Sequence, residues 1–315
     1  MFMSQHPKIK TCIICGKPRW INNSKYCRTC SQFSLRMVIK QFPPKTREAV
    51  WDYVKKNGYV CYYTKMQLDM TDPHSPWYCV FDHWKPHDSS KIVITSSLLN
   101  DMKSDLSENE FWYLIKALAD YKRHGAKIRQ IKIKYWGRDY RHDKLLDRLI
   151  MKNLSSTQKE QLCCVCGKAI LHVYSRTKYC RVCARYMIRM KEEKFPADTM
   201  KEICDYIHDS GYICYYTEMP LEVNDSGSPW YCVFDHWMPH NPSKIVLTSA
   251  VLNDMKSDLL EEEFWYYIKA FADYKTKGKK VIKKKLVSWN RLYSDLSSPN
   301  VFIGDLQGGL NEQTI

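Results

Sequence analysis

Hydrophobic and polar positions follow one another in the same order twice along this chain of 315 residues. In the first half, TREAVWDYVKKNG (46–58) has apolar residues at helical spacing and a terminal glycine, which together predict a helix with a glycine stop. Strand-like apolar segments follow at 78–83 and at KIVIT (91–95), and LLNDMKSDL (98–106) predicts a short helix. An apolar stripe at helical spacing then indicates a longer helix over 107–121.

The second half of the chain repeats this order. PWYCVFDHW starts at position 76 and again at position 229, so the shift is 229 − 76 = 153 residues. The segments GYVCYYT (58–64) and LNDMKSDL (99–106) return as GYICYYT (211–217) and LNDMKSDL (252–259). Self-similarity at a fixed period indicates a tandem repeat, here of two units of roughly 150 residues.

The longer helices of the two repeats differ at their first residue. Ser107 and Glu110 have the spacing of a capping box, in which the serine and glutamate side chains bond two backbone N–H groups at the helix start. Leu260 stands at the position of Ser107 in the second repeat, so we expect that cap to be absent there.

Composition limits the class of protein. Hydrophobic residues make up 44% of the chain, enough for globular cores, and no apolar run approaches the about 20 residues that span a bilayer. The start, MFMSQHPKIK, has no apolar signal segment, so an intracellular location without membrane insertion is expected. In that setting the 14 cysteines favour reduced thiolates that hold metal over a disulfide framework.

The charge of the chain points to a polyanionic partner. The net charge is +15, carried by Lys and Arg alongside 13% aromatic residues. Phosphate backbones favour such cations through counterion release, which makes nucleic acid the expected partner. The alternative is a basic surface that is merely solvated.

Each repeat opens with two pairs of cysteines, and two residues separate the members of each pair. This spacing lets a tight turn direct both sulfurs at one ion, and four thiolates complete a tetrahedral zinc site. Gly16 and Gly167 follow the first pairs and suit a turn that requires positive φ. We therefore expect two structural Zn²⁺ ions in treble-clef-like or zinc-ribbon fingers, held by Cys12, Cys15, Cys27 and Cys30 and by Cys163, Cys166, Cys180 and Cys183.

The remaining cysteines have a different setting. Cys164 has no counterpart in the first repeat and is interpreted as a bystander. Four others, in apolar strand-like stretches, are expected to pack in the core: Cys61, Cys79, Cys214 and Cys232.

An Asp-His pair closes the first predicted strand of each repeat. Asp82 and His83 stand there in the first repeat, and Asn100 lies on the following short helix. Carboxylate and amide oxygens suit Mg²⁺ or Mn²⁺, and a neutral imidazole beside such an ion can accept a proton from water. The second repeat offers Asp235, His236 and Asn253 at the same spacings.

The geometry of this pair sets a condition. Adjacent residues of a regular strand point to opposite faces. Asp82 and His83 therefore converge on one site only if the strand ends or twists there.

The order FDHW, KIVIT and LLNDMK resembles the HNH, or His-Me finger, nucleases, and the relatives of recombination endonuclease VII in particular. The resemblance covers about 50 residues in each repeat. It implies a ββα-metal fold in which Asp82 and Asn100 bind a catalytic divalent metal and His83 is the general base. Asp235, Asn253 and His236 would take these roles in the second repeat.

The chain departs from that pattern at one position. The asparagine by which many members orient the histidine is expected just before the second strand, where this chain has Ser90-Lys91 and Ser243-Lys244. Three alternatives follow: another group orients the imidazole, the site is slower, or the site is inactive.

Each repeat ends in a basic stretch, KIRQIKIKYWGRDYRH (127–142) and KTKGKKVIKKKLVSW (275–289). Cations interleaved with apolar residues favour a strand or helix that grips a phosphate backbone while its apolar face packs inward. Lys103 and Lys256 either contact phosphate or form the exposed face of their helix. The candidate nucleic-acid contacts are Lys91, Lys103, Lys132, Lys134, Arg138, Lys244, Lys256, Lys283, Lys284 and Lys285.

These observations combine into one hypothesis. The fold class is α+β, with a four-cysteine zinc finger at 1–45 and an HNH-like domain at 46–150, repeated at 151–197 and 198–295, and a poorly ordered tail at 296–315. The expected function is metal-dependent endonucleolytic hydrolysis of DNA by a monomer that acts as a pseudo-dimer, with two sites that cut the two strands of a duplex. The alternative is a non-catalytic zinc protein that binds nucleic acid and uses the ββα fold as a scaffold.

Overall fold

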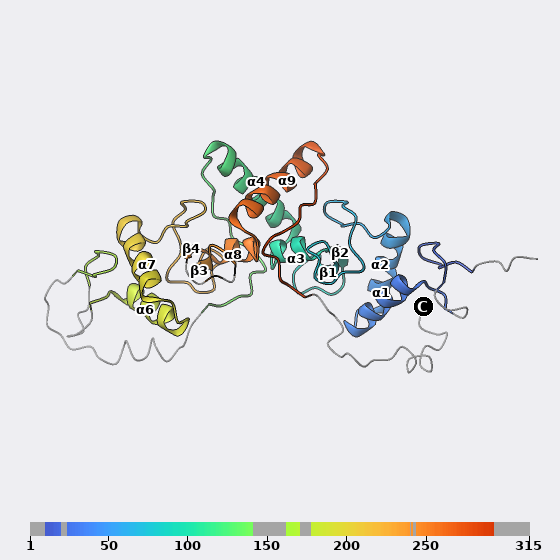
Figure 1. Ribbon diagram of the computed structural model, residues 1–315, viewed down its shortest axis with the longest axis horizontal. Helices are drawn as coiled ribbons and strands as arrows, with labels where there is room; N and C mark the ends of the chain where they lie inside the picture. Colours follow the sequence, from blue (N-terminus) through green and yellow to red (C-terminus); the bar gives the residue numbers. More distant parts are fainter. Residues whose placement is uncertain are drawn as a thin grey trace, which may run out of the picture. The chain divides into compact units, whose positions relative to one another are not determined.

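The computed structural model describes residues 10–19, 24–140, 162–170, 178–239, 241 and 244–292 (Figure 1). The chain forms two compact units that each combine parts of both repeats. The first unit contains the chain up to Asp101, Tyr274–Lys283 and the described residues from Trp289 onward. The second unit contains Met102–Asp273 and Lys284–Ser288.

Two helices follow the cysteine pairs in each repeat, and the second of them is the helix that the sequence predicts. The first repeat has α1 (Arg28–Ile39) and α2 (Pro44–Asn57), and the second has α6 (Arg181–Glu192) and α7 (Ala197–Ser210). α2 and α7 both end at a glycine with positive φ, +75° at Gly58 and +78° at Gly211. These glycine stops are confirmed.

A two-stranded antiparallel sheet lies at the centre of each repeat and leads directly into a short helix. In the first repeat β1 (Cys79–His83) pairs with β2 (Ile92–Ser96), and α3 (Ser97–Lys103) follows without a connecting loop. In the second, β3 (Cys232–His236) pairs with β4 (Ile245–Ser249), followed by α8 (Ala250–Lys256). The second strand of each hairpin is buried along its whole length, which places the hairpins inside the core. The chain is therefore α+β, as predicted.

The longer helices α4 (Glu108–His124) and α9 (Glu261–Lys277) carry the apolar stripes. The predicted capping box is present at α4: the Ser107 hydroxyl accepts from the Glu110 N–H at 3.4 Å, and the Glu110 carboxylate accepts from the Ser107 N–H at 2.8 Å. At α9 half of the box survives, since the Leu260 N–H donates to the Glu263 carboxylate at 3.0 Å. The expectation that the capping box is absent is thus correct for the hydrogen bond of the serine and wrong for that of the glutamate.

Within the second unit, α4 packs against α9 (Figure 1). The rings of Tyr121 and Trp265 lie 6.4 Å apart, and Arg123 pairs with Asp273 at 2.9 Å. The two long helices of the repeats therefore share one compact unit.

The described parts of the basic stretches that follow α4 and α9 have no regular secondary structure. Residues 125–140 and 278–292 contain neither helix nor strand, so the prediction of a strand or helix is wrong there. Four of their apolar residues are nevertheless buried, namely Ile128, Ile133, Val281 and Leu286, whereas Ile282, Val287 and Leu292 are exposed. Inward packing of the apolar residues is therefore confirmed for these four side chains and wrong for the three exposed ones.

Two other expectations concern membrane insertion and the end of the chain. Within the part of the chain that the structure describes, no helix has the length and apolar character to cross a membrane. The predicted tail at 296–315 lies outside the described residues.

Candidate functional site

The eight cysteines of the predicted zinc sites gather into two clusters. In each cluster the four Sγ atoms all lie within 4.8 Å of one another. Measured Sγ–Sγ separations are 3.5 Å for Cys15–Cys27, 3.6 Å for Cys15–Cys30 and 3.7 Å for Cys166–Cys180. A tetrahedron with Zn–S bonds of about 2.3 Å has edges of about 3.8 Å, so both clusters fit one Zn²⁺ each.

Local backbone geometry brings the sulfurs together. The Gly16 N–H donates to the Cys12 carbonyl at 3.0 Å and the Cys12 N–H to the Lys17 carbonyl at 2.7 Å, with φ of +70° at Gly16. Cys27 then caps α1, because its sulfur accepts from the Cys30 N–H at 3.5 Å. The second repeat forms the same turn and cap, with φ of +66° at Gly167 and Cys180 as the N-cap of α6.

A tyrosine hydroxyl contacts each cluster. Tyr59 donates to the Cys30 sulfur at 3.1 Å, and Tyr212 donates to the Cys183 sulfur at 3.2 Å. Hydrogen bonding from the Cys183 thiol lowers the pKa of Cys180 to about 5, while hydrogen bonding to Cys180 and burial raise the pKa of Cys183. Sequence reasoning missed both tyrosines, although each stands directly after the helix-stopping glycine in both repeats.

The other cysteines lie where the sequence predicts. Cys61, Cys79, Cys214 and Cys232 are completely buried in the core. Cys164 is exposed and outside the cluster of its neighbours, which confirms it as a bystander.

The Asp235 carboxylate lies in the core, in contact with Lys256. The Lys256 ammonium group lies 3.2 Å from Asp235 Oδ2 and 3.4 Å from Oδ1, and donates to the His236 carbonyl at 2.9 Å. The Tyr216 hydroxyl donates to Asp235 Oδ2 at 2.6 Å. Burial raises the pKa of Asp235, and the Lys256 cation opposes that rise.

In the first repeat Asp82 has the equivalent tyrosine partner. Its carboxylate is buried and accepts a hydrogen bond from the Tyr63 hydroxyl at 2.6 Å. Lys103, at the position of Lys256, is also completely buried. The expectation that Lys103 and Lys256 contact phosphate or form an exposed helix face is therefore wrong, because these ammonium groups lie in the core.

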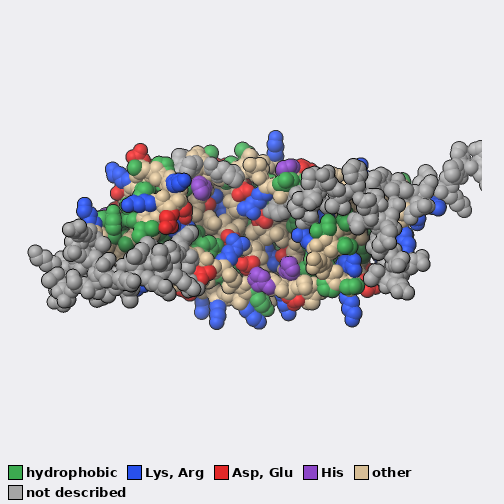
Figure 2. Space-filling model, turned by 90° about the horizontal axis from the view of Figure 1, so that it is seen from below, with side chains coloured by type: hydrophobic (Ala, Val, Ile, Leu, Met, Phe, Trp, Pro, Cys, Tyr) green, Lys and Arg blue, Asp and Glu red, His purple; other side chains and the backbone are tan. Residues whose placement is uncertain are grey.

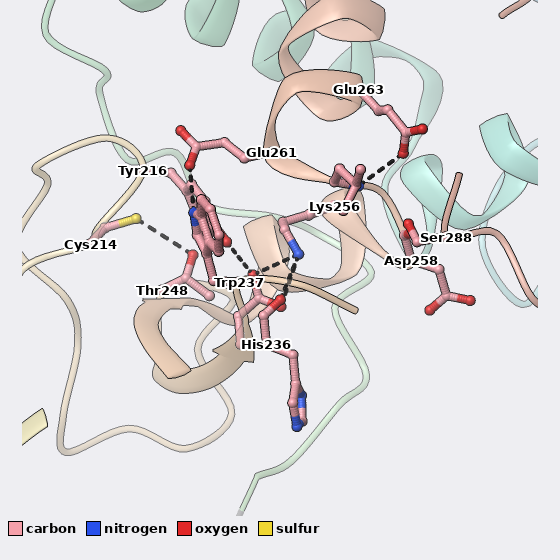
Figure 3. Close-up of polar contacts among 12 residues, drawn as sticks. Cys214, Tyr216, His236, Trp237, Thr248, Lys256, Asp258, Glu261, Glu263 and Ser288 are labelled. Atoms are coloured by element: carbon pink, nitrogen blue, oxygen red, sulfur yellow. Dashed lines mark hydrogen bonds and ion pairs between the residues drawn. The ribbon is translucent and has the colours of Figure 1, made fainter. Parts of the chain in front are cut away.

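The two histidines lie on the other side of their strands. His83 and His236 are exposed while the preceding aspartates are buried, as in a regular strand. In Figure 3 the His236 ring points away from the Lys256 ammonium group. The side chains of each Asp-His pair therefore do not converge, and the condition stated for a joint site is not met in this arrangement.

The predicted divalent-metal ligands can be tested for fit. Asn100 and Asn253 lie half-buried on α3 and α8. The oxygens of Asp235, however, are engaged by an ammonium and a hydroxyl group, so a divalent ion there has to displace Lys256. As arranged, the residues do not fit a catalytic divalent ion.

A residue that sequence reasoning missed lies near His83. The pKa of Asp88 is lowered, mainly by hydrogen bonding from Ser90 and more weakly by the charges of Lys85 and His83. The Asp88 carboxylate accepts a hydrogen bond from the Ser90 N–H at 2.9 Å, five residues after His83. In the second repeat the equivalent residue is Asn241, whereas Ser243 lies outside the described residues.

Apart from the buried Lys103 and Lys256, the candidate nucleic-acid contacts divide into two groups. Arg138 is engaged by Asp254 at 2.7 Å and Asp105 at 3.5 Å, and Lys283 donates to the Gln67 carbonyl, so both are tied within the protein. The others lie exposed, several of them over aromatic rings, as Lys91 does at 3.5 Å from the Trp84 centroid: Lys91, Lys132, Lys134, Lys244, Lys284 and Lys285. Figure 2 shows Lys and Arg side chains spread over one face, interspersed with Asp and Glu.

No protein-family model, curated protein or solved structure matches this chain. Its function is therefore argued from the geometry of its own residues.

Proposed function

We propose that this protein is a nuclease that hydrolyses phosphodiester bonds in DNA, with His83 and His236 as general bases. One observation carries the proposal. Twice in the chain an antiparallel hairpin leads directly into a short helix, with an exposed histidine at the end of the first strand and a half-buried asparagine on the helix. A duplicated scaffold with the same polar residues at the same positions is what two reaction sites in one chain require.

The chemistry follows from the exposed imidazole. A neutral imidazole accepts a proton from water at physiological pH, and the resulting hydroxide is the nucleophile for phosphorus. The exposed lysines and the net charge of +15 supply attraction for the phosphate backbone.

Zinc bound at the cysteine clusters would stabilise the fold of this protein. The two four-cysteine clusters fit closed tetrahedral sites, which stabilise a fold and leave no position open for a substrate. Each cluster includes the cysteine that caps a helix, α1 or α6, so metal binding and folding of that region are coupled.

The family resemblance also implies Mg²⁺ or Mn²⁺, held by Asp82 and Asn100 and by Asp235 and Asn253. Because Lys256 already neutralises Asp235 at 3.2 Å, such an ion would have to compete with a buried ammonium group. Whether cleavage requires a divalent ion is therefore tested separately from the role of the histidines as bases.

A second function is favoured by the same buried pair. If Lys256 permanently neutralises Asp235, the ββα unit is a scaffold and the protein binds nucleic acid without cleaving it. The exposed lysines and the zinc fingers serve this function equally well.

One experiment separates the two functions. Supercoiled plasmid is incubated with the wild-type protein and with His83→Ala/His236→Ala, with Mg²⁺, Mn²⁺ or EDTA, and DNA affinity is measured for both proteins. The nuclease proposal expects cleavage by the wild type, loss of roughly 10²–10⁴ in rate in the double variant, and retained affinity. Equal DNA binding with no cleavage by either protein would favour the scaffold function.

A further inference from the structure

The basic segment that ends each repeat contacts its own repeat and also the body of the other repeat. We call residues 125–140 and 278–292 the exchanged arms. In the second compact unit, Gln130 of the first repeat donates to the Pro220 carbonyl at 2.8 Å. Trp230 donates to the Ile131 carbonyl at 2.9 Å, and the Tyr140 N–H donates to the Ser226 carbonyl at 3.0 Å. The first arm is therefore held by the second repeat.

The opposite exchange occurs within the first compact unit. Lys283 of the second repeat donates to the Gln67 carbonyl, and its ammonium group lies 5.5 Å from the centroid of Trp77. Lys283 and Gln67 are the 153-residue equivalents of Gln130 and Pro220. The same contact is thus made twice, with the roles of the repeats interchanged.

Each exchanged arm carries an arginine to the short helix that follows the other repeat's hairpin. Arg138 donates to Asp254 Oδ1 at 2.7 Å and to the Ser104 hydroxyl at 3.0 Å, and Ser104 donates to Asp254 Oδ2 at 3.0 Å. The Asp254 side chain is 8% exposed. In the first unit Arg291 pairs with Asp101 at 2.8 Å, and the Asp101 side chain is 10% exposed.

These aspartates adjoin the asparagines of the proposed sites. Asp254 directly follows Asn253 on α8, and Asp101 directly follows Asn100 on α3. Each helix has seven residues, too few for a helix to be stable by itself, so its orientation depends on contacts with its surroundings. A charge-assisted hydrogen bond to a nearly buried carboxylate in the middle of such a helix restrains its rotation.

We propose that Arg138 and Arg291 are positioning residues in trans: each holds the asparagine-bearing helix of the repeat to which it does not belong. The claim that these arginines affect cleavage rests on the proposed function. The claim that they restrain the helices rests on the ion pairs alone. The second site is then complete only with the first repeat's arm, and the first site only with the second repeat's arm. The arginines act through Asp254 and Asp101 and need no contact with DNA.

Hydrogen exchange tests the structural part without any reference to cleavage. Arg138→Ala in the full chain is expected to raise exchange at α8 amides roughly 3- to 30-fold, and to raise it less at α3 amides. Arg291→Ala is expected to give the reverse pattern. Arg129→Ala is the matched control, since Arg129 is an exposed cation on the same arm. Equal effects of Arg138→Ala and Arg129→Ala on α8 would overturn the proposal.

Cleavage kinetics test the catalytic part. In a His83→Ala background, which leaves the second proposed base, Arg138→Ala should lower kcat roughly 3- to 30-fold more than Arg291→Ala does, with KM changed less than kcat. In a His236→Ala background the order of the two arginine variants should reverse. Arg138→Lys, which keeps the charge, should restore part of kcat.

The possible outcomes distinguish the nuclease activity from the positioning role of the arginines. Absence of cleavage by every variant and by the wild type, with the crossed exchange pattern intact, would defeat the nuclease proposal and leave the positioning role standing. A rise in KM alone would show that the arginines contact DNA. A loss of kcat at the site of the arginine's own repeat would show that each arginine positions its own repeat's helix. Either result would overturn the inference.

Discussion

Replacement of Lys256 by methionine removes the ammonium group and keeps most of the side-chain volume. Lys256 is completely buried, and Asp235 lies 3.2 Å away with 7% of its side chain exposed. The variant therefore leaves a buried carboxylate whose described hydrogen-bond partner is the Tyr216 hydroxyl. Breaking a buried ion pair in this way costs about 3–5 kcal/mol in the free energy of unfolding.

The cost should depend on pH. Burial raises the pKa of Asp235, and loss of Lys256 removes the cation that opposes this rise. A folded-state pKa above the unfolded value means that the penalty is absent when the carboxyl is protonated in both states, and grows as pH rises above the unfolded value. Lys256→Met should therefore destabilise the protein less near pH 4 than at pH 7.

Hydrogen exchange of the β3 and β4 amides is the suitable assay, because it reports the local opening free energy in a chain with more than one compact unit. The β1–β2 hairpin is the internal control. Asp235→Asn/Lys256→Met should be less destabilised than Lys256→Met, since both charges are gone. A loss below about 1 kcal/mol, or one that is the same at both pH values, would refute the reasoning.

The same variant bears on the divalent ion. If Asp235 and Asn253 can hold Mg²⁺ once the ammonium group is gone, added Mg²⁺ should restore stability, by about 2.7 kcal/mol at 100 times the dissociation constant. Unchanged exchange at every Mg²⁺ concentration would show that these residues do not form a metal site.

Further predictions concern the fingers, one helix cap and the exposed cations. Tyr212→Phe should lower zinc affinity roughly 10- to 100-fold in competition with a chelator, whereas Tyr206→Phe, which does not touch a cysteine cluster among its described contacts, should not. Ser107→Ala should destabilise α4 by about 1 kcal/mol, measured by hydrogen exchange, and an unchanged helix start would contradict the capping box. Lys284→Ala/Lys285→Ala should lower the slope of log affinity against log salt concentration by about 2 if both contact DNA phosphates, and an unchanged slope would exclude them from the interface.

Helices and the four-cysteine clusters were predictable because local rules determine them. The helix α2 follows from its apolar spacing and its glycine stop, and the four-cysteine clusters follow from the spacing of the cysteine pairs. In both cases residues close in sequence bring about the structure.

The pairing of Lys256 with Asp235 was not predictable in the same way. A lysine one turn after an asparagine on a short helix is usually exposed, and here the helix is covered so that its lysine reaches into the core. The recurring CYYT segments carried a signal, since the second tyrosine of each, Tyr63 and Tyr216, bonds the aspartate carboxylate.

The exchange of the arms could not be predicted for a different reason. The apolar residues of the basic segments, such as Ile128 and Val281, indicate that each arm is packed. Because the repeats share the same order of elements, either body offers a backbone carbonyl at the equivalent position, residue 67 or 220. No local sequence pattern therefore indicates which repeat an exchanged arm packs against.

The most direct test of two independent histidine sites is the cleavage pattern of the single variants on supercoiled plasmid. The wild type should yield linear DNA through cuts in both strands, while His83→Ala and His236→Ala should each accumulate nicked circles. If each single variant linearises plasmid at the wild-type rate, or the double variant cleaves as fast as the wild type, these histidines are not the bases and the account of two sites is contradicted.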